Sequence, residues 1–196
     1  MDLTEFWRVI ETARSTATAD RPFDAALVDV LATRPASDVL AYEERFEEMT
    51  AAVYRWDMWA AAYLIGGGCS DDSFMDFRAG LVALGREWYE KASARPDALA
   101  ENPVVAEDAT VGGVDYVFYE DVNYAARTAY ERITGAEDFY EACTRHRAAR
   151  GEEDRTPVDM GEEFDFDDEA EMHRRFPRLS ALFLDDDGTH ESGDAA

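Results

Sequence analysis

Apolar residues recur at the spacing of an α-helix along nearly all of the first 150 residues, and this period constrains the fold more than any other feature. Phe6, Ile10 and Ala13 set the pattern near the start, and Phe74 and Phe77 repeat it further along. Strand-like alternation is nearly absent, apart from one short β-favouring run at 116–119 for which no partner strand is evident. We therefore predict an all-α fold, a single-domain helical bundle of about seven or eight helices.

Capping and breaking residues place the helix boundaries. Asp2 or Thr4 is expected to cap the first helix, Pro22 to open the second, and Ser37 and Ser70 to cap later ones. A glycine run at 66–68 ends the longest segment. The expected helices span 2–17, 22–33, 37–66 with a kink at 55–57, 70–84, 86–94, 114–134 and 136–150, with a loop or short helical turns at 96–113.

The last quarter of the chain differs in composition from the rest. We expect a helical domain at 1–150, followed by an acidic flexible linker at 151–171, because that segment holds eleven acids and one arginine. Residues 172–184 are apolar and locally basic, and we expect them to form a docking segment that packs on the acidic domain or on a partner. Residues 185–196 hold five acids and no base, which predicts a disordered acidic tail.

The charge balance excludes several classes of partner. The chain has 44 acidic and 19 basic residues, giving a formal net charge of −25. Such a charge repels nucleic-acid phosphates and anionic lipids, so direct nucleic-acid binding is disfavoured and a protein partner of basic character is favoured. The longest apolar run, 58–68, is far shorter than the roughly 20 residues that a membrane-spanning helix needs. We expect no membrane association.

Cysteine usage and the sequence start predict a cytoplasmic protein with reduced thiols. Two cysteines are too few for a disulfide scaffold, and the start has neither the basic residues nor the apolar run of a signal peptide. No cofactor or metal is predicted. The glycine run lacks the lysine and hydroxyl residue of a phosphate loop, and Cys143 with His146 makes only one ligand pair. The oligomeric state is not defined by the sequence.

Residues 56–78 combine aromatic residues, a glycine run, a cysteine and three aspartates, and any functional site is predicted to lie there. Trp56, Trp59 and Tyr63 share one helical face, which either lines a cleft that stacks a ligand or belongs to the core. Gly67 permits a left-handed helix end. Cys69 precedes a helix N-terminus, which favours thiolate, but neighbouring carboxylates oppose it, so a small buried residue at a tight turn is the alternative.

The aspartates of this stretch also admit two interpretations. In the first, the aspartates and Arg78 form a cluster that binds a divalent cation or carries out acid/base catalysis. In the second, their role is structural: Asp71 and Asp72 complement the helix dipole, and Asp76 pairs with an arginine. The candidate ligand or partner site therefore comprises Trp56, Trp59, Tyr63, Gly67, Cys69, Ser70, Asp71, Asp72, Asp76 and Arg78.

Several local patterns resemble a known bacterial family. They are Phe6-Trp7, the block from Trp56 to Arg78 that contains Gly-Gly-Cys-Ser-Asp-Asp-Ser-Phe and Asp-Phe-Arg, and Gly85-Arg86-Glu87. Together they resemble the domain of unknown function numbered four thousand two hundred and forty, over roughly residues 1–130. The closing run 175–179, Arg-Phe-Pro-Arg-Leu, is similar to the family's C-terminal motif. The resemblance implies a small helical bacterial domain without an assigned activity.

Three classes of function remain open from the sequence. The favoured one is a non-enzymatic binding or regulatory module with a cleft at the glycine turn, 66–78. The second is a small hydrolase-like enzyme that uses Asp71, Asp72, Asp76 and Arg78, with or without a divalent cation. The third is an acidic mimic of nucleic acid that occupies a basic protein partner, for which the acidic runs of the last quarter are the relevant segments.

Overall fold

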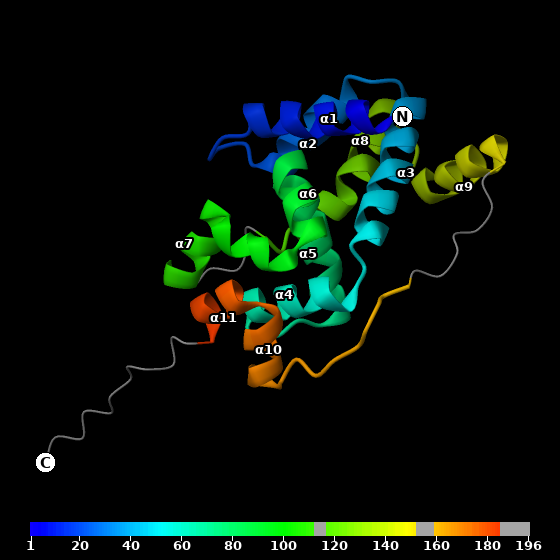
Figure 1. Cartoon of the computed structure of the whole chain (residues 1–196). Helices are drawn as coiled ribbons and strands as arrows, with labels where there is room; N and C mark the ends of the chain where they lie inside the picture. Colours follow the sequence, from blue (N-terminus) through cyan, green and yellow to red (C-terminus); the bar gives the residue numbers. More distant parts are fainter. Residues whose placement is uncertain (112–116, 152–158, 185–196) are drawn as a thin grey trace, which may run out of the picture.

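The computed structural model describes residues 1–111, 117–151 and 159–184 (Figure 1). Within these ranges the chain is helical and contains no strand, only an isolated bridge between Thr18 and Arg21. The predicted all-α class is confirmed. The helices are α1 (Leu3–Thr16), α2 (Phe23–Ala32), α3 (Ala36–Ala52), α4 (Trp56–Gly66), α5 (Asp71–Ala83), α6 (Arg86–Ala94), η1 (Pro96–Glu101), α7 (Pro103–Val111), η3 (Glu120–Tyr124), α8 (Ala125–Thr134), α9 (Phe139–Arg150), α10 (Glu169–Arg175) and α11 (Pro177–Phe183).

The helices are more numerous than the seven or eight predicted. Two expected long helices are interrupted, the expected loop at 96–113 contains η1 and α7, and the residues after 159 form α10 and α11. The expected kink at 55–57 is a full break, since Arg55 is extended with φ −141° and ψ 153° between α3 and α4. The helix expected to begin at 114 instead has non-helical residues at 117–119 before η3 and α8. There the Tyr119 backbone N–H donates to the Asp76 carbonyl of α5 at 3.1 Å rather than to a helical neighbour.

Helix caps follow the sequence at two of the predicted positions. The Asp2 side chain accepts a hydrogen bond from the Glu5 backbone N–H at 2.8 Å, and the Ser70 hydroxyl accepts one from the Ser73 N–H at 3.2 Å. Ser37 does not cap α3. The helix begins one residue earlier, at Ala36, and Pro35 takes the capping position without a side-chain hydrogen bond.

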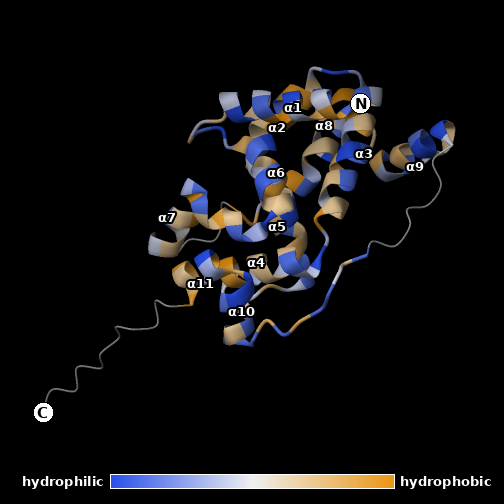
Figure 2. Cartoon of the chain, in the orientation of Figure 1, coloured by the Kyte–Doolittle hydropathy of each residue, from blue (hydrophilic) through white to orange (hydrophobic). Residues whose placement is uncertain are grey.

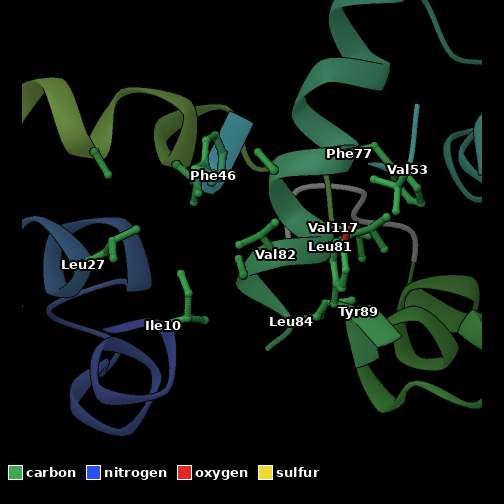
Figure 3. Packing of buried hydrophobic residues seen from close by; sticks show 14 of the residues in the cluster. Ile10, Leu27, Phe46, Val53, Phe77, Leu81, Val82, Leu84, Tyr89 and Val117 are labelled. Atoms are coloured by element: carbon green, nitrogen blue, oxygen red, sulfur yellow. The ribbon is translucent and has the colours of Figure 1, made fainter. Parts of the chain in front are cut away.

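Helix α5 lies in the middle of the molecule and packs against α1, α3, α4, α6 and η3 (Figure 1). Each helix carries both apolar and polar residues, as expected for elements that bury one face (Figure 2). The chain at 117–119 crosses α5 so closely that a Cβ on Gly80 would lie 1.8 Å from the Val117 carbonyl oxygen. Figure 3 shows Val117 of this crossing chain next to Leu81 of α5. Glycine at position 80 therefore allows direct backbone contact.

The last part of the described chain, residues 160–183, is called the C-terminal segment below. It runs beside α4 and ends in α10 and α11, and α11 packs against η1, α4 and α7 (Figure 1). The expected tail at 185–196 and residues 152–158 of the expected linker lie outside the described residues. The division into helical domain, flexible linker, docking segment and disordered tail stays a prediction.

One sequence expectation concerns membranes. Within the described ranges, no helix has the length and the apolar content needed to cross a bilayer.

Candidate functional site

The glycine turn joins α4 to α5 by a left-handed helix end. Gly67 has φ +59°, and the Gly68 N–H donates to the Tyr63 carbonyl at 2.9 Å, which satisfies a carbonyl at the end of α4. A Cβ on Gly67 would meet no atom within 4 Å, so the glycine is needed for its backbone angle and not for space. Ser70 then caps α5, which places Asp71 and Asp72 in the first turn of that helix.

A surface hollow of about 390 Å³ opens beside this turn, between the end of α3 and the start of α5. Asp71 and Asp72 are exposed at its edge, and Arg78 is half-buried within it. The hollow is lined by Ala51, Tyr54, Asp71, Asp72, Met75 and Arg78. It overlaps the predicted cleft at 66–78, and three of the ten predicted site residues, Asp71, Asp72 and Arg78, line it.

Arg78 is held by carbonyl groups and aromatic rings. Its Nη1 donates to the Thr50 carbonyl at 3.1 Å, and its Nε donates to the Phe74 carbonyl at 3.3 Å. The guanidinium lies 4.8 Å from the ring centroid of Tyr54 and 5.1 Å from that of Phe74, in cation–π contact with both. Burial lowers the pKa of Arg78 from its ordinary value. The side chain is thus fixed in position with part of its donor set still unused.

The three aspartates do not converge on one point. Asp76 is oriented toward η3, where its Oδ1 accepts a hydrogen bond from Asn123 Nδ2 at 2.9 Å. Burial raises the pKa of Asp76, and the nearby carboxylates of Glu120 and Asp72 raise it further. The expected pairing of Asp76 with an arginine is absent among the described residues. Of the two nearest candidates by sequence reasoning, Arg55 pairs with Asp57 at 2.9 Å, and Arg78 is held by carbonyl groups and rings.

No group of three or more histidine, cysteine, aspartate or glutamate side chains in the described ranges is arranged to hold a metal ion. The hollow contributes only Asp71 and Asp72 to such a set, because Asp76 is engaged by Asn123. The cation-dependent interpretation of the aspartates stays a hypothesis, with Asp71 and Asp72 as the two of the three that line the hollow.

The aromatic stripe of α4 faces other side chains of the same protein. Trp59 stacks on Phe74 with ring centroids 4.7 Å apart, and its Nε1 donates to the Cys69 carbonyl at 3.0 Å. Trp56 and Tyr63 lie against Phe166 of the C-terminal segment, at 6.1 Å and 5.5 Å between centroids. The Tyr63 hydroxyl also donates to Asp167 Oδ1 at 2.6 Å. These three aromatic residues therefore do not line the hollow.

Cys69 is half-buried at the turn, and burial raises the pKa of its thiol to about 11. The carboxylates of Asp71 and Asp76 act in the same direction, whereas the contact with Trp59 opposes it. A nucleophilic cysteine needs a lowered pKa, because the thiolate is the reactive form. The half-buried position and the raised pKa of Cys69 favour the second interpretation, a small residue at a tight helix turn.

Alkylation tests this assignment. At pH 8, Cys69 is expected to react with iodoacetamide about 100-fold more slowly in the folded protein than in the protein unfolded in urea, because a thiol with pKa near 11 holds far less thiolate than one near 8.5. Peptide mass spectrometry over time measures both rates, and the folded-state rate should rise about tenfold per pH unit. Equal rates in the two states would contradict the assignment.

Several residues of the hollow and of its surroundings were not predicted as site residues from the sequence. Ala51, Tyr54 and Met75 carry no chemistry that marks them, and Tyr54 is indistinguishable from a core residue in the apolar stripe of its helix. Asn123 and Phe166 are 47 and 103 residues from Asp76 and Tyr63, their respective partners. No local pattern in the sequence indicates such long-range contacts.

Fold and site together define a small all-helical domain with a solvent-open hollow beside a glycine turn. The chain belongs to the family described as "Protein of unknown function (DUF4240)", whose model matches residues 1–132. This match confirms the resemblance drawn from the sequence, and it includes α1 to α7 and every residue that lines the hollow. No curated protein and no solved structure matches the chain significantly.

Proposed function

We propose that the protein is a non-enzymatic binding module of the cytoplasm and that the hollow beside the glycine turn is the face that contacts a protein partner. A single observation carries the proposal: Arg78 has no carboxylate within 4.0 Å among the described residues. Every other arginine in the described ranges forms an ion pair.

This isolation is unexpected in so acidic a chain. With 44 acids against 19 bases, an arginine at the surface meets carboxylates at high local density. Arg78 is instead held beneath two exposed carboxylates by the Thr50 and Phe74 carbonyls and two aromatic rings. Its unused N–H donors remain available for an acceptor from outside the chain.

The charges around the hollow indicate the chemistry of the partner. Asp71 and Asp72 are exposed at the edge and suit a basic side chain, while Arg78 suits a carbonyl or carboxylate oxygen. Met75 is 39% exposed in the same hollow and offers apolar contact area. A protein segment with a basic residue close to an acidic or carbonyl group fits this arrangement.

Site-specific crosslinking tests the proposal in the native host. A photoreactive residue at Met75 is expected to capture a discrete partner, whereas one at Tyr140, which is 58% exposed on α9, should not. The affinity of the purified partner should then fall at least about tenfold in the double variant Asp71→Lys/Asp72→Lys, because the change places like charges at the contact.

The matched control is Glu87→Lys/Glu90→Lys on α6, which makes the same change in net charge outside the hollow and should leave the affinity within about threefold. Capture of the same proteins from Met75 and Tyr140, or equal losses in both charge variants, would refute the proposal.

Calorimetric titration separates the enzyme alternative: saturable micromolar Mg²⁺ or Mn²⁺ binding that is lost in Asp72→Asn would favour it. The nucleic-acid-mimic alternative depends on acidic runs that lie partly outside the described residues.

A further inference from the structure

The C-terminal segment is anchored to the body of the protein by three buried apolar side chains. Met172 and Leu179 are 0% exposed and Phe176 is 3% exposed, although the segment contains only two short helices. Leu179 lies on α11, which packs against η1, α4 and α7, and the surface that these three elements present to α11 is called the groove below.

Asp97 of η1 makes the most specific contact in the groove. Its Oδ1 accepts hydrogen bonds from the backbone N–H groups of Arg178 and Leu179, both at 3.0 Å, and the residue is only 5% exposed. Pro177 has no N–H, so these are the first two donors that α11 presents. A buried carboxylate aligned with them recognises a chain that turns into a helix directly after proline.

The segment makes further contacts with the body of the protein, in addition to those of Phe166 and Asp167 with α4 described above. Arg178 pairs with Glu101, and the Trp56 N–H donates to the Met160 carbonyl at 3.0 Å. The Ser180 hydroxyl is fully buried yet has no hydrogen-bond partner among the described residues. Its unsatisfied burial makes the free energy of binding of the segment less favourable. The contact is therefore specific, but it is not optimised for maximal strength.

The groove and its occupant come from separate parts of the chain, and the run 175–179 of the occupant is the one similar to the family's C-terminal motif. All three groove elements lie within residues 1–132, which the family model matches, whereas the occupant begins at residue 160. We propose that the groove formed by η1, α4 and α7 is a peptide-docking site of the family domain, that its ligand is a segment of the form Phe-Pro-x-Leu, and that residues 160–183 of the same chain fill it as an exchangeable intramolecular ligand.

This proposal does not depend on the hollow or on its partner, because the two sites share no residue. The covalent connection through residues 151–159 keeps the segment at high effective concentration, so it stays seated in the intact chain even with modest intrinsic affinity. Cutting that connection should convert the contact into a bimolecular equilibrium with a Kd in the micromolar range.

The experiment uses the full chain with a sequence-specific protease site introduced between residues 151 and 159. After cleavage, a fluorescently labelled synthetic peptide of residues 160–184 is added, and its anisotropy is expected to rise saturably as it replaces the cleaved segment. Asp97→Ala in the domain should weaken binding at least tenfold, because two backbone donors lose their acceptor. Glu101→Ala, which removes only exposed ion pairs to Arg178 and Arg95, should weaken it less than about fivefold.

Peptide variants provide matched controls. Leu179→Ala should abolish measurable binding, Arg174→Ala should leave it unchanged because Arg174 pairs only within the segment, and Ser180→Ala should strengthen it severalfold by removing the unsatisfied hydroxyl. Unfolding of the domain on cleavage, by circular dichroism, or a cleaved segment that never exchanges would refute the proposal, since the segment would then be core. A dimer that swaps segments, by light scattering of the intact chain, would refute occupancy by the same chain.

Discussion

Replacement of Gly80 by alanine is expected to lower the free energy of unfolding by about 3 kcal/mol or more. The added Cβ would lie 1.8 Å from the carbonyl oxygen and 2.6 Å from the carbonyl carbon of Val117, both backbone atoms. A flexible side chain could move aside, but here the whole chain at 117–119 must shift, and with it the hydrogen bond from Tyr119 to the Asp76 carbonyl. Urea unfolding followed by circular dichroism measures the loss.

Gly66→Ala is the matched control for this variant. Gly66 is also helical and faces the same crossing chain, but the three atoms nearest to its added Cβ all belong to the Phe118 ring, with Cζ at 3.0 Å. The ring can shift slightly, and alanine favours the helix by about 1 kcal/mol, so we expect a net change within about 1 kcal/mol. A Gly80→Ala variant as stable as Gly66→Ala would show that the crossing is looser than the structure indicates.

Replacement of Phe74 by alanine is expected to cost about 3–5 kcal/mol. Phe74 is fully buried, and its ring stacks on Trp59 at 4.7 Å and on Tyr54 at 5.7 Å between centroids. Its removal leaves a cavity between α4 and α5 and also takes away one of the two rings that hold the Arg78 guanidinium. Loss of stability and distortion of the hollow should therefore occur together.

Met75→Ala, one position along the same helix, is the control for Phe74→Ala. Met75 is 39% exposed in the hollow, and we expect its truncation to cost less than about 1 kcal/mol. Chemical denaturation of the two variants in parallel gives the comparison. Similar losses at positions 74 and 75 would mean that the packing of α5 does not distinguish its inner and outer faces as described.

The helices and several of their boundaries could be predicted because their causes are local. Apolar spacing sets which face of a helix is buried, and capping by Asp2 and Ser70 depends on residues within three positions. The left-handed end at Gly67 is equally local. The division of the expected helix at 114–134 could not be predicted, because Tyr119 is drawn out of the helical pattern by α5, more than 40 residues away.

The candidate site was only partly predictable for the same reason. Asp71, Asp72 and Arg78 have side chains whose chemistry is visible in the sequence, and they do line the hollow. The other wall comes from the end of α3 and from Tyr54 just after it, and their alignment with α5 depends on core packing rather than on any short pattern. The role of Trp56 and Tyr63 could not be predicted either. An aromatic helix face that binds a ligand and one that is covered by another residue of the chain, here Phe166, have the same local sequence.

Trp59 gives the molecule an internal optical reporter. Its indole N–H is bonded to the carbonyl of Cys69 just after the glycine turn, and its ring stacks on Phe74, which also contacts Arg78. Indole emission responds to hydrogen bonding and to the polarity around the ring, so a partner that shifts Arg78 or the turn should alter the intrinsic fluorescence of the unlabelled protein. The chain has only four tryptophans, so replacing the others one at a time by phenylalanine can isolate this signal for direct measurement of binding.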